Sequence, residues 1–200
     1  MTYGIDTKNL LIIPCLKKTL HLDISLEKNH TSFLEHADYL IDKLCLTAHP
    51  EGGFFKETHC SDIVIKKDAL PKGYTGERPL MTAIYFLLKG DDFSAFHLLK
   101  SDELWHFYLG SSMTIWIIRP NGELDEMNLG NHMGNNEVCQ ATIPAGCWFG
   151  ASVDDKESFS LVGCTVSPGF HFDDFELAQR DDLIRTYPAH EAIIRMLTRG

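Results

Sequence analysis

The sequence lacks the cysteine patterns that mark a zinc site or a redox pair, because none of its six cysteines falls in a CxxC pair or at a zinc-type spacing. Several lie in apolar runs such as SLVGCTV, where a reduced thiol behaves as a small hydrophobic side chain. We therefore expect reduced cysteines and a cytoplasmic location, since disulfides are rare in that compartment.

Positive charge is also scarce. The chain has 18 Lys and Arg against 28 Asp and Glu, which gives a formal net charge of −10. A protein that binds nucleic acid or an anionic membrane needs a basic stripe to neutralise phosphates, so we expect neither partner. A local basic pocket remains compatible with this charge.

Long apolar runs are missing as well. The N-terminal run LLIIPCL covers only Leu10 to Leu16 and is interrupted by Pro14. It is too short to span a bilayer, and it has no small-x-small cleavage site of a signal peptide. We therefore expect an intracellular chain without a membrane partner.

What the sequence does contain suits one globular domain, since 44% of its 200 residues are hydrophobic. Residues 1–31 show no clear period and are expected to be an extension, which leaves 32–200 as the folded domain. Ser32 and Glu35 form a capping box before apolar residues at helical spacing, which predicts a helix up to about Leu44. The segments DFELAQRDDLIRTY and PAHEAIIRMLTR predict C-terminal helices, the last with Pro188 in its first turn.

The middle of the chain changes to β-type patterns. Short runs rich in β-branched and aromatic residues alternate with turns such as KGDD, KSDE and LGSS. The predicted strands are TAIYFLL, SAFHLL, ELWHFYL, SMTIWII, VCQATI, CWFGASV and FSLVGCTV. The Asn121-Gly122 pair is the strongest hairpin signal. Short strands at this spacing indicate a β-sandwich or barrel.

The stretch FSAFHLLKSDELWHFYLG carries polar residues inside an apolar strand pattern. Together with the preceding turn, it fits the first cupin motif, which consists of a glycine, HxH, a glutamate and a second glycine. The matching residues are Gly90, His97, Glu103 and Gly110, and those that match the second motif, PxGxxH, are Pro144 and Gly146. The sequence thus resembles the cupin superfamily. This resemblance implies a mainly β fold, the double-stranded β-helix or jelly roll, with flanking N- and C-terminal helices.

Two of the usual four cupin metal ligands are replaced in these motifs. Leu99 stands at the second histidine of HxH, and Phe149 stands at the histidine of the second motif. A metal site of this kind needs about three to four nitrogen or oxygen ligands. We therefore expect no bound metal and no other cofactor.

Longer segments sharpen the resemblance. HPEGGFFKETHCSD, SDELWHFYLG, TIPAGCWFGA and LVGCTVSPGFHFDDFELA resemble the cupin-5 branch of uncharacterised cupins, from about Leu46 to the C-terminus. More distantly, GGFFKE, SAFHL and IPAG are similar to segments of dTDP-4-dehydrorhamnose 3,5-epimerases, which implies that His97 is a catalytic base. Gly52 and Ala95 stand where those enzymes have arginines, and SLVGCT lacks their tyrosine acid.

The candidate catalytic residues are His97 and Glu103. An imidazole with a pKa near neutrality suits proton transfer, and a carboxylate between apolar neighbours needs a donor or takes a raised pKa. The alternatives are a hydrogen-bonded core histidine and a solvated side chain beside a turn. We expect both side chains on adjacent strands, within hydrogen-bond or one-water reach, facing a pocket that also exposes Trp105.

The candidate ligand-binding residues are Glu51, Glu57, Arg78, Trp105, His106 and Phe149. Arg78 is expected to hold an anionic group bidentately, or else to pair with one of the two glutamates. Trp105 and Phe149, with Trp116 and Phe172, are candidates for an aromatic wall, although core packing is favoured for Trp116. Strand alternation puts His106 opposite Glu103 unless a bulge intervenes.

The sequence therefore predicts a metal-independent epimerase or isomerase that binds a small polar ligand of the sugar or nucleotide-derivative type. The alternatives are a non-catalytic small-molecule-binding module and a metal-dependent cupin enzyme. A homodimer is also expected, because a jelly roll leaves sheet edges and a broad apolar face that a second copy commonly covers.

Overall fold

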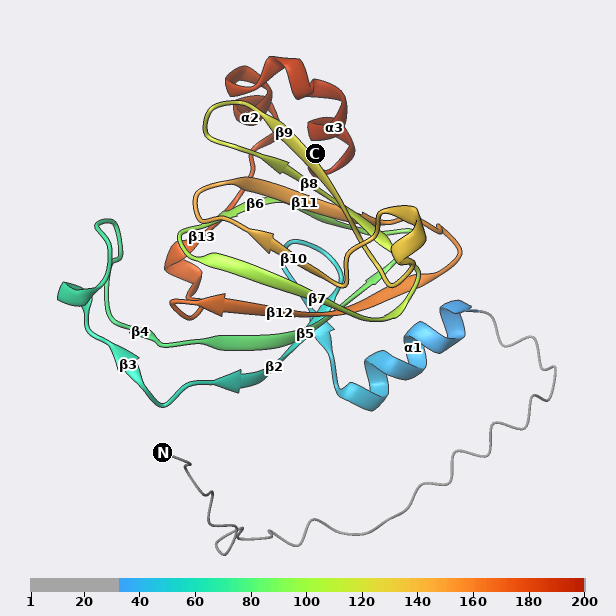
Figure 1. Ribbon diagram of the computed structural model, residues 1–200, viewed down its shortest axis with the longest axis horizontal. Coiled ribbons are helices and arrows are strands. Elements are labelled where there is room, and N and C mark those ends of the chain that lie inside the picture. Colours follow the sequence, from blue (N-terminus) through green and yellow to red (C-terminus); the bar gives the residue numbers. More distant parts are fainter. Residues whose placement is uncertain (1–32, 200) are drawn as a thin grey trace, which may run out of the picture. The chain divides into compact units, whose positions relative to one another are not determined.

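The computed structural model describes residues 33–199, which form two antiparallel β-sheets packed face to face as a jelly roll (Figure 1). A short third sheet pairs β3 (Val64–Ile65) with β4 (Arg78–Pro79). The expected mainly β fold with flanking helices is therefore confirmed. The expected extension over 1–31 and the capping residue Ser32 lie outside the described residues.

The larger sheet has six strands in the order β1-β2-β5-β12-β7-β10. These are β1 (Thr47–Ala48), β2 (Phe54–Cys60), β5 (Thr82–Lys89), β12 (Phe159–Ser167), β7 (Asp102–Gly110) and β10 (Gln140–Ile143). The smaller sheet has the order β13-β6-β11-β8-β9. These are β13 (Phe175–Leu177), β6 (Phe93–Leu99), β11 (Trp148–Val153), β8 (Met113–Ile118) and β9 (Leu124–Leu129). All the strands predicted from the sequence are present, and Asn121-Gly122 lies in the β8–β9 turn as expected.

The main core fills the space between the two sheets. Strand alternation directs every second side chain inward, and the inward positions carry large apolar residues. The fully buried ones include Phe86, Leu88, Trp105, Met113, Ile115, Ile117, Phe149 and Val162. Burying a side chain of this size contributes about 1.5–3 kcal/mol, so this layer supplies most of the hydrophobic stabilisation.

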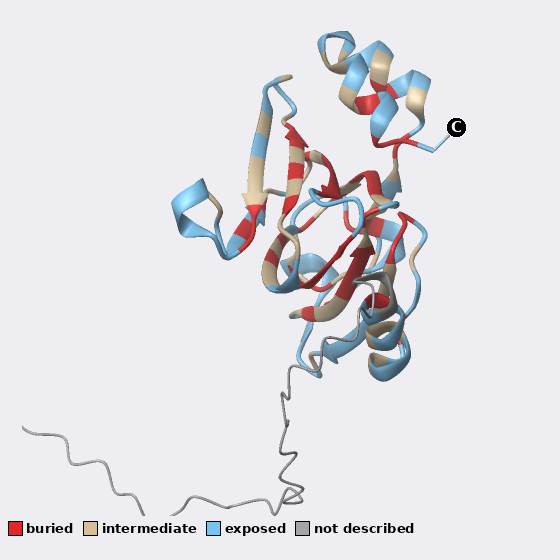
Figure 2. Ribbon diagram, turned by 90° about the vertical axis from the view of Figure 1, so that its right-hand side faces the viewer, coloured by how far each residue is buried: buried red, intermediate tan, exposed pale blue. Residues whose placement is uncertain are grey.

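Helices cover the outer faces of the sheets. Helix α1 (Phe33–Leu44) packs on the six-stranded sheet through a cluster that includes Ala37, Leu87 and Leu161. Helices α2 (Arg180–Thr186) and α3 (Glu191–Met196) pack beside the five-stranded sheet. Figure 2 shows buried residues concentrated along the strands, whereas the outer sides of the helices are exposed.

The C-terminal segment differs from its predicted structure. DFELAQRDDLIRTY was expected to be helical throughout, but it contains β13, and the helix begins only at Arg180. Phe175 and Leu177 are partly buried and the intervening Glu176 is exposed, which is a period of two. Backbone pairing with β6, from Phe175 opposite Leu99 to Leu177 opposite His97, outweighs the helical pattern.

Two further expectations concern the whole of the described range. The cysteines within residues 33–199 are all free: Cys45, Cys60 and Cys139 are exposed, and Cys147 and Cys164 are buried. Among the same residues, no helix has the length and apolar character that crossing a membrane requires.

Candidate functional site

A cavity of about 50 Å³ lies inside the jelly roll. Its apolar lining comes from Phe55, Ile84, Phe86, Leu99, Val166, Phe170 and Phe175. Its polar lining comes from His49, Glu51, Thr82, His97, Glu103 and Cys164. The cavity therefore brings together both predicted catalytic residues and Glu51.

His97 and Glu103 reach this cavity from opposite sheets. His97 lies on β6 of the five-stranded sheet, and Glu103 lies near the start of β7 in the six-stranded sheet. The expectation of adjacent, paired strands was wrong, because the Lys100-Ser101 turn carries the chain from one sheet to the other. No hydrogen bond joins the two side chains within residues 33–199.

The imidazole of His97 is fixed on both edges. Its Nδ1 lies 2.8 Å from the carbonyl oxygen of Ala95, and since a carbonyl can only accept, Nδ1 carries a hydrogen. Its Nε2 lies 3.3 Å from Oε2 of Glu51. The ring packs against Phe149, with 4.0 Å between centroids, and against Phe175. These contacts leave Nε2 as the nitrogen available for chemistry.

The side chain of Glu51 is positioned by a backbone bend that only glycine adopts readily. Gly52 and Gly53 have φ values of 116° and 66°, which residues with a Cβ atom rarely adopt. The Ala95 N–H donates to the Glu51 carbonyl oxygen at 2.8 Å, and the Ser94 hydroxyl donates to Glu51 Oε1 at 2.9 Å. The backbone and one carboxyl oxygen of Glu51 are thus held by β6.

Arg199, which follows α3, also holds this bend in place through hydrogen bonds. Its guanidinium lies 2.8 Å from a carboxylate oxygen of Asp92 and 3.1 Å from the carbonyl oxygen of Phe93. Asp92 in turn accepts the Gly53 N–H at 2.9 Å. A Cβ atom at Gly52 would collide with both the Phe93 carbonyl and the Arg199 guanidinium. The bend is therefore clamped between β6 and the end of the chain.

At least one proton must lie among Glu51 and its two histidine neighbours. The second histidine is His49, whose Nδ1 accepts the Glu51 N–H at 3.3 Å and lies 3.4 Å from Glu51 Oε2. In neutral imidazoles, the Nδ1 of His49 and the Nε2 of His97 would both present lone pairs to that oxygen. Burial raises the pKa of Glu51 and lowers those of both histidines. The shared proton is therefore favoured on the Glu51 carboxyl group.

The carboxyl group of Glu103 differs from that of Glu51, because one of its oxygen atoms has no hydrogen-bond partner among the described residues. It is buried, and its Oε2 has no hydrogen-bond partner within residues 33–199. Burial raises its pKa to about 7, against the opposing effect of the His97 charge. The protonated and ionised forms of Glu103 are thus both populated near neutral pH, which is the condition for a group that both takes and returns protons.

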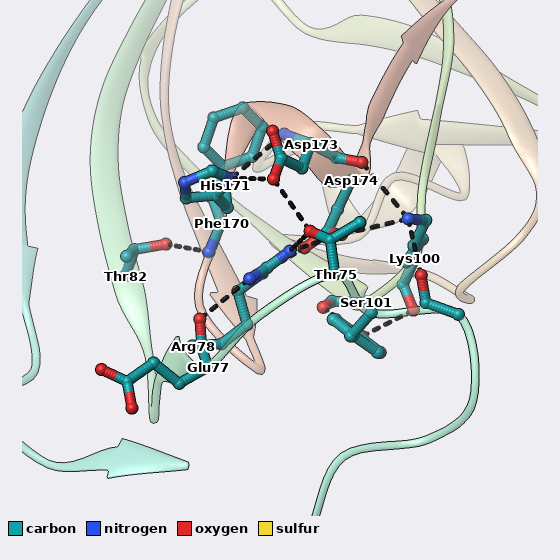
Figure 3. Close-up of polar contacts among 12 residues, drawn as sticks. Thr75, Glu77, Arg78, Thr82, Lys100, Ser101, Phe170, His171, Asp173 and Asp174 are labelled. Carbon is teal, nitrogen blue, oxygen red and sulfur yellow. Dashed lines mark hydrogen bonds and ion pairs between the residues drawn. The ribbon is translucent and has the colours of Figure 1, made fainter. Parts of the chain in front are cut away.

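Arg78 does not line the cavity. It is buried and forms a bidentate ion pair with Asp174, with Nε–Oδ2 and Nη2–Oδ1 distances of 2.5 and 2.9 Å. Lys100 approaches the same carboxylate at 3.3 Å (Figure 3). The partners proposed from the sequence, Glu51 and Glu57, were therefore wrong. The guanidinium is already occupied by a carboxylate of its own chain.

This ion pair holds one wall of the cavity. Asp174 lies in the segment 170–175, whose Phe170 and Phe175 line the cavity. The Phe170 N–H donates to the hydroxyl of Thr82 at 2.9 Å, a second anchor visible in Figure 3. Arg78 therefore has a structural link to the site rather than a place in its lining.

Of the predicted ligand-binding residues, only Glu51 lines this cavity, and Glu57, Trp105, His106 and Phe149 lie outside its lining, as Arg78 does. Glu57 is exposed on β2, and Trp105 is only 1% exposed, packing between Phe86 and Phe149. The expectation that the pocket exposes Trp105 was wrong, because the aromatic core covers the indole. Phe149 is buried behind the His97 ring.

The alternation argument for His106 is confirmed. Its ring nitrogen Nδ1 is hydrogen-bonded to the side-chain amide of Gln140 on the neighbouring β10, at 3.0 Å, and the ring does not line the cavity. The proposed aromatic wall is also incomplete, since Phe172 is 57% exposed and Trp116 packs in the cluster beneath α2 and α3.

Sequence reasoning missed His49, Thr82, Cys164, Phe170 and Phe175 as lining residues. For His49 a signal existed, because the residue stands two positions before Glu51 and three positions before Gly52. Phe170 and Phe175 flank a short 3₁₀ turn late in the chain, and no local pattern indicates that this turn folds back over the cavity.

The residues present do not fit a cupin-type metal ion. Leu99 lines the cavity with an apolar side chain, and Phe149 fills the second position with a ring packed on His97. Within residues 33–199, no group of three or more His, Cys, Asp or Glu side chains is arranged to hold a metal.

Comparison with known proteins gives a consistent family assignment. The model of the family Cupin_5, described as Cupin superfamily (DUF985), matches residues 38–178. The solved structure of protein SO0799 from Shewanella oneidensis is 42% identical, with a TM-score of 0.73, covering 82% of this chain and 98% of that one. A hypothetical protein from Leishmania major is 32% identical, with a TM-score of 0.74 and coverages of 82% and 99%. The uncharacterized protein YML079W of Saccharomyces cerevisiae is 27% identical over 73% of this chain and 77% of its own length.

Proposed function

This chain belongs to the Cupin_5 (DUF985) family of the cupin superfamily, and we propose that its cavity binds a small polar ligand of the sugar type and transfers a proton next to a carbonyl group. The reaction class is that of a metal-independent epimerase or isomerase. Such chemistry needs one group that removes a proton from carbon and another that protonates the developing oxyanion.

The observation that carries this proposal is the pair of unequal carboxyl groups at one cavity. Glu51 has its Oε2 against two imidazole nitrogens, an arrangement that requires a proton. Glu103 has a free Oε2 and a pKa of about 7. Two titratable groups with different environments provide an acid and a base in one site. Glu51 thereby supplies the acid that the sequence had left without a candidate.

The proposed step uses the site residues as follows. The Glu103 carboxylate removes a proton from the carbon beside the carbonyl, and the electron pair moves onto the carbonyl oxygen. That oxygen takes the proton of Glu51, whose carboxyl group is held against Nε2 of His97. In an isomerisation, Glu103 returns its proton to the former carbonyl carbon, while the hydroxyl on the other carbon becomes the carbonyl and gives its proton to Glu51. In an epimerisation, the original carbon takes a proton from water on its opposite face, the enol hydroxyl gives its proton back to Glu51, and Glu103 releases its proton to solvent. His97 then acts as the partner that shares the Glu51 proton, and the role of base expected for it moves to Glu103.

The test is exchange of the carbon-bound proton with solvent. Ligands are first identified by thermal shift with sugars and keto-sugars, and their exchange is then followed by NMR in D₂O. Exchange should be lost in Glu103→Gln and His97→Gln and retained in Glu57→Gln and His106→Gln, matched controls outside the cavity. Binding without exchange in the wild-type protein would instead support the non-catalytic binding module.

We also propose the homodimer expected from the sequence, formed through the part of the six-stranded sheet that α1 leaves open. Tyr108 is 51% exposed there and packs edge-to-face against Tyr85. Light scattering at micromolar concentration should give about twice the chain mass of 22.6 kDa. A mass equal to one chain would overturn this proposal.

A further inference from the structure

Resting on the proposed function, we infer that the cavity selects an uncharged ligand: a short α-hydroxycarbonyl compound, or the uncharged end of a sugar, without phosphate or carboxylate in the cavity. Three features of the described residues support this inference: the charge of the lining, the partners of the nearby cations, and the volume.

The lining has acidic groups and no strong base. Two carboxyl groups and two imidazoles face the cavity, and the lining residues within 33–199 include neither Lys nor Arg. A phosphate or carboxylate in this space would lie close to the carboxylate form of Glu103 without a compensating cation. Like charges a few ångströms apart in a poorly solvated site repel strongly, so an anion is disfavoured.

The cations of the adjoining loops are already bound to acceptors of the protein. Arg78 holds Asp174 through two hydrogen bonds and also donates to the carbonyl oxygen of Glu77. Lys100 donates to the carbonyl oxygens of Gly73 and Asp173 and approaches Asp174 (Figure 3). Moving Arg78 into the cavity would take the bidentate partner away from the buried Asp174 carboxylate, and moving Lys100 would break its contacts with two carbonyl oxygens and with Asp174, so both moves are disfavoured.

The volume limits the enclosed part of the ligand to a few atoms. The cavity measures about 50 Å³, far below the roughly 300–1,000 Å³ of pockets that enclose a drug-sized ligand. A two- or three-carbon hydroxycarbonyl fragment fits it.

The hydrogen-bonding groups match the same class. Glu51 offers one proton to an acceptor, and Glu103 offers an unpaired oxygen to a donor. An α-hydroxycarbonyl compound carries a carbonyl acceptor and a hydroxyl donor on neighbouring carbons. The phenylalanine rings of Phe55, Phe86, Phe170 and Phe175 then surround its carbon skeleton.

The experiment compares matched probes that differ in charge. Binding of hydroxyacetone and dihydroxyacetone is measured by ligand-observed NMR beside dihydroxyacetone phosphate and lactate, with wild-type protein, Glu103→Gln and the exposed control Glu57→Gln. We expect the neutral probes to bind wild-type protein at least about tenfold more tightly than the anions. Glu103→Gln should narrow this gap, because it removes one carboxylate, and Glu57→Gln should leave it unchanged.

The outcomes separate this inference from the proposed function. Equal or tighter binding of the anions, or no binding of the neutral probes, would overturn the inference, while Glu103-dependent proton exchange on any ligand would still support the reaction. Neutral selectivity without exchange would uphold the inference and remove the reaction. Thermal unfolding of each variant shows whether it is folded, and His97→Gln provides a second cavity substitution if Glu103→Gln is not.

Discussion

The segment 170–175 contacts two buried groups of ionisable side chains, because it contains Asp174 and also lines the cavity. The two groups differ in whether their charges are paired. In one, Arg78 and Asp174 match in charge and geometry, and further contacts with Thr75, the Glu77 carbonyl oxygen and Lys100 use their remaining hydrogen-bonding atoms. In the other, at the cavity, Glu51 and Glu103 have only imidazoles as possible counterions, and Glu103 Oε2 has no partner within the described range.

The difference separates a structural cluster from a reactive one. A matched buried pair holds its charges fixed, because removing one partner strands the other. An unmatched group keeps a shifted pKa and an unsatisfied atom, which lowers stability and favours proton exchange. Proximity and burial alone therefore do not identify the site; the balance of charge within each cluster does.

Breaking the matched pair should have the largest effect on stability. Arg78→Met leaves the buried Asp174 carboxylate with only the partly exposed Lys100 beside it, so we expect the free energy of unfolding to fall by about 3–5 kcal/mol. Urea denaturation measures this change. The double variant Arg78→Met/Asp174→Leu should recover most of the loss, because no buried carboxylate remains and Lys100 is partly exposed to solvent. A single-variant loss below about 1 kcal/mol would show that the pair is not the anchor we describe.

Neutralising the unmatched group should stabilise the protein at high pH. The pKa of Glu103 rises from its ordinary 4.5 to about 7, so the native state binds more protons than the unfolded state between these values, and stability falls as pH rises through them. Glu103→Gln removes this dependence and should exceed wild-type stability above pH 7 by on the order of 3 kcal/mol.

The gain should vanish near pH 4.5, where wild-type Glu103 is protonated in the folded state and increasingly so in the unfolded state. Denaturation of both proteins at pH 5 and pH 8.5 measures the difference. A Glu103→Gln variant that is less stable than wild type at both pH values would contradict the raised pKa.

Removing the Arg199 contacts that hold the Glu51 bend should change ligand binding or proton exchange more than it changes the free energy of unfolding. Arg199→Ala removes hydrogen bonds to Asp92 and to the Phe93 carbonyl from a partly exposed side chain, at a cost of about 1 kcal/mol. Because Arg199 acts through the bend that carries Glu51, ligand affinity or proton exchange should fall. Arg199→Lys should restore part of that loss. If Arg199 has only a structural role, Arg199→Ala should leave both ligand affinity and proton exchange unchanged.

The smallest effect is expected for an exposed pair. Lys66 and Glu77 are 2.7 Å apart, but their side chains are 73% and 56% exposed. Solvent screens such pairs, so Lys66→Met should change the free energy of unfolding by less than about 1 kcal/mol. This variant is the surface control for Arg78→Met, measured in the same urea experiment. A loss as large as that of the buried pair would mean that burial does not decide the outcome.

Much of the fold could be predicted because its signals are local. The alternation of β7 correctly separated Glu103 from His106, and turn residues marked the strand ends. The site was only partly predictable because its decisive contacts are distant. Arg78 and Asp174 are 96 positions apart, and no local pattern links them. Strand parity shows that Trp105 points inward, but not that Phe86 and Phe149 cover it.

The distance between Arg78 and Asp174 along the chain also constrains how the protein is made. At about 5–20 residues per second, a ribosome needs roughly 5–20 s to add the 96 positions between them. During that interval the guanidinium has no buried partner, and β5 still lacks β12, its neighbour in the sheet. The cavity can close only after the segment 170–175 is synthesised. Pairings between such distant segments are slow to form, so chaperone binding is expected to matter most just before this segment emerges.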